Sequence, residues 1–351
     1  MKKRILIAPL NWGLGHATRC IPIIHALLGH GFTPVIASDG AALVLLKKEF
    51  PDLVFDELPG YNVTYSAKAS QFRWKLFKES PKLLRAITAE KKATQFLVDT
   101  YKIDGIISDN RLGVYCKKVP CVFITHQLNV LSGNTTWFST KIHQNIIKKF
   151  DECWIPDHEF EPNLSGKLGH EDNTRIVKKY LGPLSRLKKQ KQDNQYDVMV
   201  LLSGPEPQRT LLEKKIINEL KAYNGKVLFV KGIMEKEQTI TRVGLVCYYN
   251  FMQSHQLEKA INSSSVVLSR SGYTTVMDLA KIGKKAFFIP TPGQFEQEYL
   301  AKRFEDLKMV PTCNQVDFKI EMLEQVKKYS GLEINSVSLN FSTLFRLFQS
   351  E

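Results

Sequence analysis

Short apolar runs alternate with longer polar and amphipathic stretches along the first half of the chain. The runs are rich in Val and Ile and lack a strict apolar–polar alternation, which is typical of strands buried on both faces of a parallel sheet. Stretches with a helical pattern separate most of them. The pattern predicts strands at residues 5–10, 34–38, 53–58, 105–108, 121–125 and 153–155, with helices such as 17–30, 41–50 and 82–99.

The alternation pauses after residue 174, where Gly182 and Pro183 precede a polar, basic run without a core-facing strand. We expect the linker between two domains at this place. The alternation then restarts. Strands are predicted at 197–202, 226–231, 245–250, 266–269 and 285–289, and helices at 209–222, 274–282 and 297–307.

The pattern therefore predicts an α/β protein with two doubly wound, Rossmann-like domains that face each other across a cleft. The expected boundaries are 1–175 for an N-terminal domain, 176–196 for the linker and 197–335 for a C-terminal domain. A last amphipathic helix within 336–351 is expected to pack back on the N-terminal domain.

The composition is that of a globular protein without a membrane span. Hydrophobic residues make up 43% and charged residues 24% of the 351 residues, and no apolar run approaches the ~20 residues needed to cross a bilayer. The basic N-terminus leads into a strand-like run without a cleavage site, so no signal peptide is expected. The six cysteines contain no CxxC pair, which favours reduced thiols in the cytoplasm and no metal site.

The net charge of +14 favours anionic partners. Residues 67–92 concentrate this charge, with eight Lys or Arg against two acids and interleaved aromatic residues. Such a segment either lies on an anionic membrane surface or buries one aromatic face in its own core. The charge favours the membrane, and the aromatic residues slightly favour the core.

A glycine-rich loop follows the first predicted strand. Gly13 and Gly15 permit a tight turn and close approach of a ligand to the backbone, and the following helix presents N–H groups there. His16, at the helix entrance, can exchange a proton near neutral pH. We interpret strand, glycine turn and histidine as a candidate catalytic site.

Two further loops follow predicted strands of the second half. Ser271, Gly272 and Thr275 lie at a helix start that favours phosphate, with Arg270 as a charged contact and Asp278 as a ligand for sugar hydroxyls. Ordinary helix capping explains the same residues about as well.

The second of these loops carries amides and carboxylates that suit hydroxyl-rich ligands, at Gln294, Gln297 and Glu298. Two weaker sites are Arg209, near a tight turn, and the segment of His126 and Asn129. A lone histidine such as His126 is more often structural than a ligand.

Together these motifs resemble the GT-B glycosyltransferases of the family 28 type, which include the UDP-N-acetylglucosamine transferase of lipid II synthesis. The resemblance covers the whole chain in architecture and is most specific in the second half. It implies a UDP-sugar donor, His16 as general base, Asp278 on the ribose and the backbone near Phe251 on the uracil. Glu298 departs from the Gln that is usual in the family. The residues implied at the donor are Gly13, Gly15, Asn129, Arg209, Phe251, Arg270, Ser271, Gly272, Thr275, Asp278, Gln294, Gln297 and Glu298.

The resulting hypothesis is an inverting glycosyl transfer that needs no metal and no other cofactor. The acceptor is an unidentified hydroxyl compound, with a glycan or a lipid-linked molecule as candidates, and the enzyme is expected in the cytoplasm or at the inner face of its membrane. A nucleotide-sugar epimerase or hydrolase on the same fold remains an alternative.

Two less favoured alternatives also remain. An NAD-dependent dehydrogenase would use Gly13 and Gly15 as a near match to G-x-G-x-x-G. A nucleic-acid binder would explain the charge but neither loop.

Overall fold

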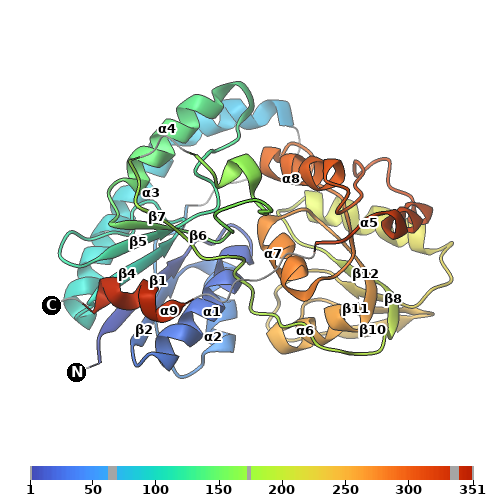
Figure 1. Cartoon of the computed structure of the whole chain (residues 1–351), viewed down its shortest axis with the longest axis horizontal. Coiled ribbons are helices and arrows are strands. Elements are labelled where there is room, and N and C mark those ends of the chain that lie inside the picture. Colours follow the sequence, from blue (N-terminus) through green and yellow to red (C-terminus); the bar gives the residue numbers. More distant parts are fainter. Residues whose placement is uncertain (1, 62–68, 172–174, 333–339, 350–351) are drawn as a thin grey trace. The chain divides into compact units, whose positions relative to one another are not determined.

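The computed structural model describes residues 2–61, 69–171, 175–332 and 340–349, with helix side chains from residue 83 onward in the segment 69–101 (Figure 1). The chain forms two compact units. Unit 1 comprises Met1–Thr64, Phe72–Leu184 and Ser336–Glu351, and unit 2 comprises Tyr65–Gln71 and Ser185–Asn335.

The described residues of unit 1 form a seven-stranded parallel sheet in the order β3-β2-β1-β4-β5-β6-β7. The central strands consist of apolar residues that are almost fully buried, because helices cover both faces of the sheet. The strands are β1 (Arg4–Pro9), β2 (Thr33–Ser38), β3 (Val54–Glu57), β4 (Gly105–Asp109), β5 (Cys121–Ile124), β6 (Glu152–Ile155) and β7 (Lys178–Tyr180).

The helices of unit 1 connect these strands as the predicted pattern requires. Helix α1 runs from Gly15 to Gly29 and buries its apolar face, including Ile23, Ile24 and Leu27. The others are α2 (Gly40–Glu49), α3 (Ala69–Tyr101) and α4 (Thr136–Ile147), with short 3₁₀ turns at Gly133–Thr135 and Gly166–Leu168.

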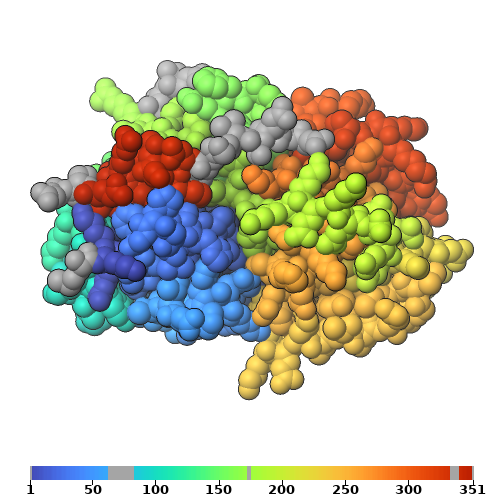
Figure 2. All heavy atoms as spheres, turned by 60° about the horizontal axis from the view of Figure 1, so that its bottom comes forward, coloured from blue at the N-terminus to red at the C-terminus, as the bar shows by residue number. Residues whose placement is uncertain are grey.

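The C-terminal segment completes unit 1. It forms the short helix α9 (Phe341–Leu344) and the 3₁₀ turn η4 (Phe345–Phe348), which lie against the N-terminal residues in Figure 2. The rings of Phe345 and Phe348 are buried and lie 6.3 Å and 6.2 Å from the ring of Trp154. These contacts pack the C-terminal segment into the core of unit 1.

The described residues of unit 2 form a six-stranded sheet in the order β10-β11-β9-β8-β12-β13. All pairs are parallel except β10 with β11, which form an antiparallel pair at one edge. The strands are β8 (Tyr196–Leu201), β9 (Val227–Val230), β10 (Ile240–Val243), β11 (Val246–Tyr249), β12 (Ser264–Ser269) and β13 (Ala286–Phe288). The helices are α5 (Gln208–Leu220), α6 (Ser254–Asn262), α7 (Tyr273–Ile282) and α8 (Phe295–Asp306), with a 3₁₀ segment at Ile320–Lys328.

The parallel α/β class is confirmed, whereas two details of the prediction are wrong. The segment expected as a strand-free linker contains β7, which pairs with β6, and Leu181, Leu184 and Leu187 beyond it are buried. Three residues give too weak a periodicity to be recognised as a strand. The edge strand β10 is antiparallel and exposed throughout, so its sequence lacks the apolar run of a buried strand.

Candidate active site

Each sheet has one place where the strand order reverses, and open α/β sheets bind ligands at the carboxyl ends of strands at such a point. In unit 1 this point lies between β1 and β4, and in unit 2 it lies between β8 and β12. The glycine loop with His16 follows β1, and the loop with Arg270 to Gly272 follows β12. Both principal motifs therefore lie at switch points.

His16 of unit 1 has a carboxylate partner that the sequence motifs did not reveal. Its Nδ1 lies 2.8 Å from Oδ1 of Asp109, the last residue of β4. The His16 side chain is 14% exposed and Asp109 is fully buried. The contact with buried Asp109 thus fixes the His16 side chain, which remains partly exposed.

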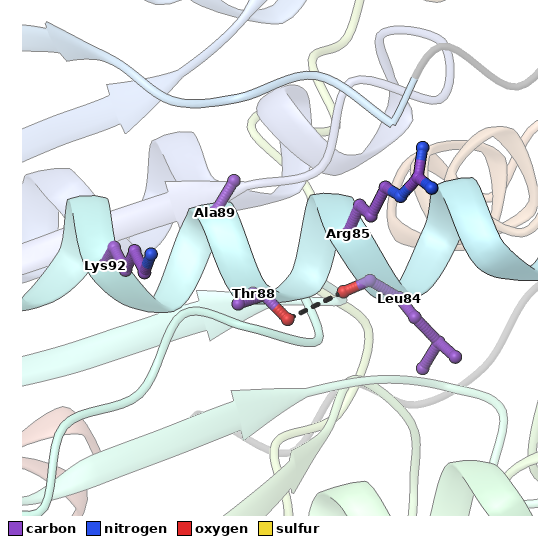
Figure 3. A pocket seen from close by; sticks show the side chains of 5 residues that line it. All are labelled: Leu84, Arg85, Thr88, Ala89 and Lys92. Atoms are coloured by element: carbon purple, nitrogen blue, oxygen red, sulfur yellow. Dashed lines mark hydrogen bonds between the residues drawn. The ribbon is translucent and has the colours of Figure 1, made fainter.

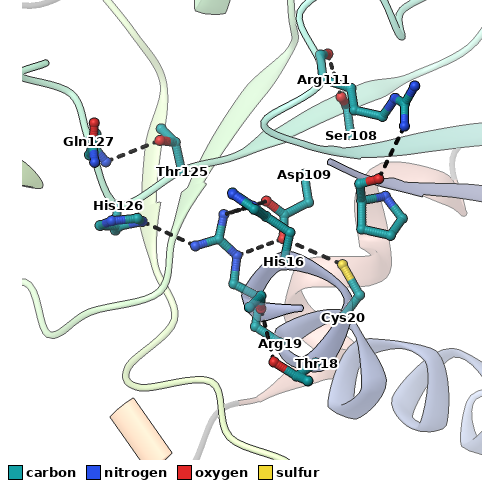
Figure 4. Close-up of polar contacts among 12 residues, drawn as sticks. His16, Thr18, Arg19, Cys20, Ser108, Asp109, Arg111, Thr125, His126 and Gln127 are labelled. Carbon is teal, nitrogen blue, oxygen red and sulfur yellow. Dashed lines mark hydrogen bonds and ion pairs between the residues drawn. The ribbon is translucent and has the colours of Figure 1, made fainter. Parts of the chain in front are cut away.

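Arg19 lies on α1, three residues after His16, and joins this pair (Figure 4). Its Nε donates to Oδ2 of Asp109 at 2.6 Å, and its Nη2 donates to Oδ1. Nη2 also lies 2.9 Å from Nδ1 of His16, and Nη1 lies 3.1 Å from Nδ1 of His126. His126 follows β5, so three neighbouring elements contribute to one buried cluster.

The charges of this cluster shift the pKa values of its members. Burial and then the charge of Arg19 lower the pKa of His16, whereas the charge of Asp109 and its hydrogen bond act in the opposite direction. Burial opposes the ionisation of Asp109, yet Arg19 and His16 together hold its pKa below the ordinary value. The site therefore pairs an ionised carboxylate with a neutral imidazole.

The glycine loop before His16 is braced by a second buried network. Arg111 donates to Glu90 of α3 (2.6 Å) and to Asp39 (2.7 Å), and Asp39 accepts from the amide of Asn11 at 3.2 Å. Gly13 has a φ of +79° and open space where a Cβ would stand. The loop is thus anchored at Asn11 and exposed at Gly13, as close approach of a ligand requires. Gly15 is the first residue of α1.

In unit 2, the turn at Ser271 and Gly272 leads into α7. Ser271 is buried and its hydroxyl donates to the carbonyl of Gln297 at 2.7 Å, so it fixes the loop. Gly272, the residue before α7, has no side chain that could cap the helix, and it faces open space. Thr275 is half-buried in this turn. The helix end therefore offers the N–H groups and positive dipole that favour an anion.

Arg270 does not project toward a ligand as the sequence suggested. It is 1% exposed, and its two terminal nitrogens donate to the carbonyls of Ile289, Pro290 and Gln208 and to Oε1 of Gln315. Burial lowers its pKa to about 10. Its four terminal hydrogens are used, because the loops after β12 and β13 and the start of α5 meet around it. A direct charged contact with a ligand stays a prediction, and the two terminal nitrogens could make it only by exchanging these partners.

Arg209 is likewise unsuited to the phosphate contact predicted for it. Its guanidinium forms ion pairs with Glu206 and Glu213, both at 2.6 Å, and donates to the carbonyl of Lys231. Two carboxylates neutralise the charge that would attract a phosphate. The sequence contained the signal for this, since both acids lie within four residues of Arg209.

Asp278 lies on α7 and is 8% exposed. Its Oδ1 accepts a hydrogen bond from the hydroxyl of Ser185 at 2.5 Å. Burial raises its pKa to about 6, and the nearby Arg186 and the Ser185 hydroxyl only partly offset this effect. A carboxylate in such surroundings is suited to bind hydroxyl groups that restore its solvation.

The amide-rich loop after β13 uses its polar groups internally. Gln297 accepts from the N–H of Thr291 (2.9 Å) and donates to Oε1 of Gln294 (2.6 Å). Glu298 accepts from the N–H of Gly293 at 2.8 Å. Gln297 is buried, whereas Glu298 is exposed. Gln297 therefore shapes the loop, and because its amide has a second N–H and a second lone pair, the sugar contact stays a prediction.

Two other predicted donor residues have structural partners. The amide of Asn129 donates to the carbonyls of Lys167 and His170 and joins two loops of unit 1. The N–H of Phe251 donates to Oδ1 of Asn250, and its carbonyl accepts from Gln238. The N–H of Phe251 is thus engaged within unit 2, whereas its carbonyl can accept a second hydrogen bond, so the uracil contact stays a prediction.

The described residues also contain a shallow cavity of about 360 Å³ along α3. Leu84, Arg85, Thr88, Ala89 and Lys92 line it (Figure 3). In the described ranges, no cluster of three His, Cys, Asp or Glu could hold a metal ion. Among the same residues, no helix has the length and apolar character needed to cross a membrane.

Sequence reasoning missed Asp109, Arg19 and Ser185. Asp109 directly follows the predicted strand at 105–108, and Arg19 is one helical turn after His16. The position of Asp109 at the end of a predicted strand and that of Arg19 on the helix face of His16 were the sequence signals that could have identified them. Ser185 could not be found, because its approach to Asp278 depends on the path of the chain between β7 and β8.

Known proteins share this architecture and these sequence features. Residues 208–335 match the Glycosyltransferase family 28 C-terminal domain. An uncharacterized glycosyltransferase of Methanosarcina acetivorans is 23% identical over 343 residues, covering 86% of this chain and 83% of that protein. The UDP-N-acetylglucosamine–N-acetylmuramyl-(pentapeptide) pyrophosphoryl-undecaprenol N-acetylglucosamine transferase of Haemophilus ducreyi is 23% identical over 218 residues, covering 60% and 58%.

Solved structures show the same fold at low identity. The crystal structure of MurG from Acinetobacter baumannii matches with a TM-score of 0.54 and 13% identity, covering 99% of this chain and 92% of that one. The glycosyltransferase of kitacinnamycin matches with a TM-score of 0.63 and 12% identity over 93% and 90%. Two parallel α/β units of this kind define the GT-B fold. The chain thus has the GT-B fold, and its residues 208–335 match the C-terminal domain of the family 28 glycosyltransferases.

Proposed function

We propose that the protein transfers a sugar, with inversion, from a UDP-sugar to a hydroxyl of an acceptor. Unit 2 binds the donor in this proposal. The start of α7 at the switch point, where Gly272 leaves open space before the helix, carries the assignment, with the diphosphate at the helix N-terminus and Asp278 on the ribose. The Haemophilus ducreyi relative is named for a UDP-N-acetylglucosamine donor, which supports the choice of nucleotide.

The same surroundings support transfer without a metal ion. A departing UDP gains negative charge, and fixed N–H donors with a helix dipole stabilise such charge without reorganisation. The guanidinium of Arg270 lies buried behind this loop, and no acid pairs with it among the described residues. Its charge acts through space rather than by contact, so we assign it a supporting role for the diphosphate.

Unit 1 supplies the base. The single observation that carries this step is the contact of His16 with buried Asp109 at the switch point of the sheet. Nδ1 of His16 donates a hydrogen bond to Asp109, which leaves Nε2 to take the proton from the attacking hydroxyl. Gly13 and Gly15 allow the acceptor to approach the loop. A general base of this kind contributes about 10²–10⁴-fold to the rate.

The experiment that tests this function compares the wild type with His16→Ala, using release of UDP from UDP-sugars as the readout. Turnover should fall by about 10²–10⁴-fold while the affinity for UDP is retained. Thr343→Ala, an exposed change in the C-terminal helix, is a matched control with wild-type activity. Unchanged turnover of His16→Ala would remove this residue from the mechanism. Product analysis then separates transfer from epimerisation or hydrolysis.

We further propose a lipid-linked acceptor at an anionic membrane surface. The net charge of +14 and the lipid-linked substrates named for the relatives support this. Most of the basic segment 67–92 lies outside the described side chains, but Arg85 and Lys92 in its second half are exposed at the α3 cavity. Flotation with vesicles of anionic lipid at low salt tests the idea, and no binding there would contradict it.

A further inference from the structure

Arg19 has no role in the sequence motifs, yet it occupies the centre of the candidate catalytic cluster. Its side chain is 1% exposed. One guanidinium contacts a carboxylate and two imidazoles, and these come from α1, from the end of β4 and from the loop after β5. A buried arginine that touches the proposed base on the side away from the surface is placed to control the state of that base.

We propose that Arg19 is a positioning residue that keeps His16 neutral, with its proton on Nδ1, so that Nε2 is ready to accept a proton at physiological pH. The inference rests on the proposed function, in which His16 is the general base. It goes beyond that function because it names the residue that sets the pH range of the base.

The geometry favours the Nδ1–H tautomer of His16. Nδ1 lies 2.8 Å from Oδ1 of Asp109 and 2.9 Å from Nη2 of Arg19. If Nδ1 had no proton, its lone pair would face the lone pairs of a carboxylate at hydrogen-bond distance. With the proton on Nδ1, both the imidazole and the guanidinium donate to Oδ1 of Asp109. In this arrangement every short contact joins a donor to an acceptor, except the contact between Nδ1 of His16 and Nη2 of Arg19, which are both donors.

The charges around His16 explain why the ring stays neutral. The titratable and charged groups that act on it are Arg19 from its own helix, Asp109 from β4 and His126 after β5. A carboxylate alone would stabilise the imidazolium. The bidentate contact with Arg19 cancels the charge of Asp109, so burial decides the balance and disfavours the charged ring.

His126 contacts the same guanidinium. A guanidinium can only donate hydrogen bonds, so Nδ1 of His126 accepts from Nη1 of Arg19. Arg19 thus contacts both histidines, His126 directly and His16 both directly and through Asp109.

The test is a pH titration of ¹⁵N-labelled protein by NMR, with His16→Ala used to assign the signal. In the wild type we expect His16 to be neutral at pH 6.5 and to carry its proton on Nδ1. Titration at pH 7 or above, or a proton on Nε2 in the neutral ring, would overturn the proposal. This measurement needs neither substrate nor a second variant.

Variants then separate the charge of Arg19 from its packing. Arg19→Met should raise the proton affinity of His16 at least tenfold, because Asp109 loses its counter-charge, and Arg19→Lys should restore most of the difference. Arg209→Met is the matched control, since Arg209 is also buried and paired with carboxylates but belongs to unit 2 and is not among the groups that shift the pKa of His16. Equal titration in Arg19→Met and the wild type would refute the role of the charge.

The kinetic readout connects this inference to the reaction. In the wild type, kcat/KM should stay level down to about pH 6.5, and in Arg19→Met its acid limb should move up with the NMR titration. If His16→Ala keeps full turnover, the proposed base is wrong, while the NMR result still decides what Arg19 does to the ring. The two failures are therefore distinguishable.

Discussion

Donor binding should depend on pH through Asp278. Its carboxyl is buried, and its pKa is raised to about 6 from an ordinary 3.8. An ionised carboxylate can accept hydrogen bonds from both ribose hydroxyls, whereas the protonated form offers one oxygen less. Bound hydroxyls should therefore return the pKa toward its ordinary value, and binding below pH 6 must release a proton.

The size of the effect follows from linkage. If binding restores a pKa near 3.8, the affinity at pH 5 is about tenfold weaker than at pH 7, and close to one proton is released at pH 5. In the absence of ligand, the effect of pH on the stability of the fold has the opposite sign. Because the pKa is raised on folding, this group stabilises the fold below pH 3.8, and the contribution of about 3 kcal/mol is lost as the pH rises through 6.

Calorimetry with uridine is the suitable assay, because uridine has no phosphate that titrates in this range. Titrations at pH 5 and 7 in buffers of different ionisation enthalpy give both the affinity and the released protons. Asp278→Asn should bind more weakly, show no pH dependence and unfold at higher urea concentration at pH 8. A flat affinity in the wild type, or the same slope in Asp278→Asn, would refute the role of this carboxylate.

Three further predictions concern stability and can be checked by urea unfolding. Asp109→Asn should lower the free energy of unfolding by about 3–5 kcal/mol, because it leaves Arg19 buried without its counter-charge. The double variant with Arg19→Met should lose less stability than the sum of the two single variants. Simple additivity would contradict a coupled pair. Phe345→Ala should lower the free energy of unfolding by about 3–5 kcal/mol, since this ring is fully buried in unit 1. Thr343→Ala changes an exposed residue and should lower it little. Equal effects of the two variants would contradict the packing of the C-terminal segment. Gly40→Ala should destabilise more than Gly244→Ala, because both glycines have positive φ but only at Gly40 would a Cβ collide with Asn11; the reverse order would refute the bracing of the glycine loop.

The parallel strands and the switch points could be predicted, because buried strands give strong apolar runs and their loops follow from the topology. The short strand β7 and the exposed strand β10 could not, since neither carries such a run. The same contrast holds at the site. His16 was visible through its glycine loop, but its partner Asp109 is 93 residues away, and only the parallel pairing of β1 and β4 brings the two together.

The arginines show the limit of motif reasoning most clearly. Arg270 and Arg209 are at the expected places in the sequence, yet carbonyl groups surround the first and carboxylates neutralise the second. A motif gives the position of a side chain along the chain, whereas its partners depend on loops from distant strands. Arg19, which no motif indicated, contacts both the proposed base and its carboxylate partner.

The most direct test of the central claim is a calorimetric screen of the purified protein against UDP, other nucleoside diphosphates and NAD, each with EDTA and with magnesium. The proposal predicts that UDP binds equally well with and without the metal, and more tightly than the other ligands. Binding of NAD alone, or of UDP only with magnesium, would contradict a metal-independent UDP-sugar transferase. No response to any nucleotide would contradict the assignment of unit 2 as the donor-binding unit.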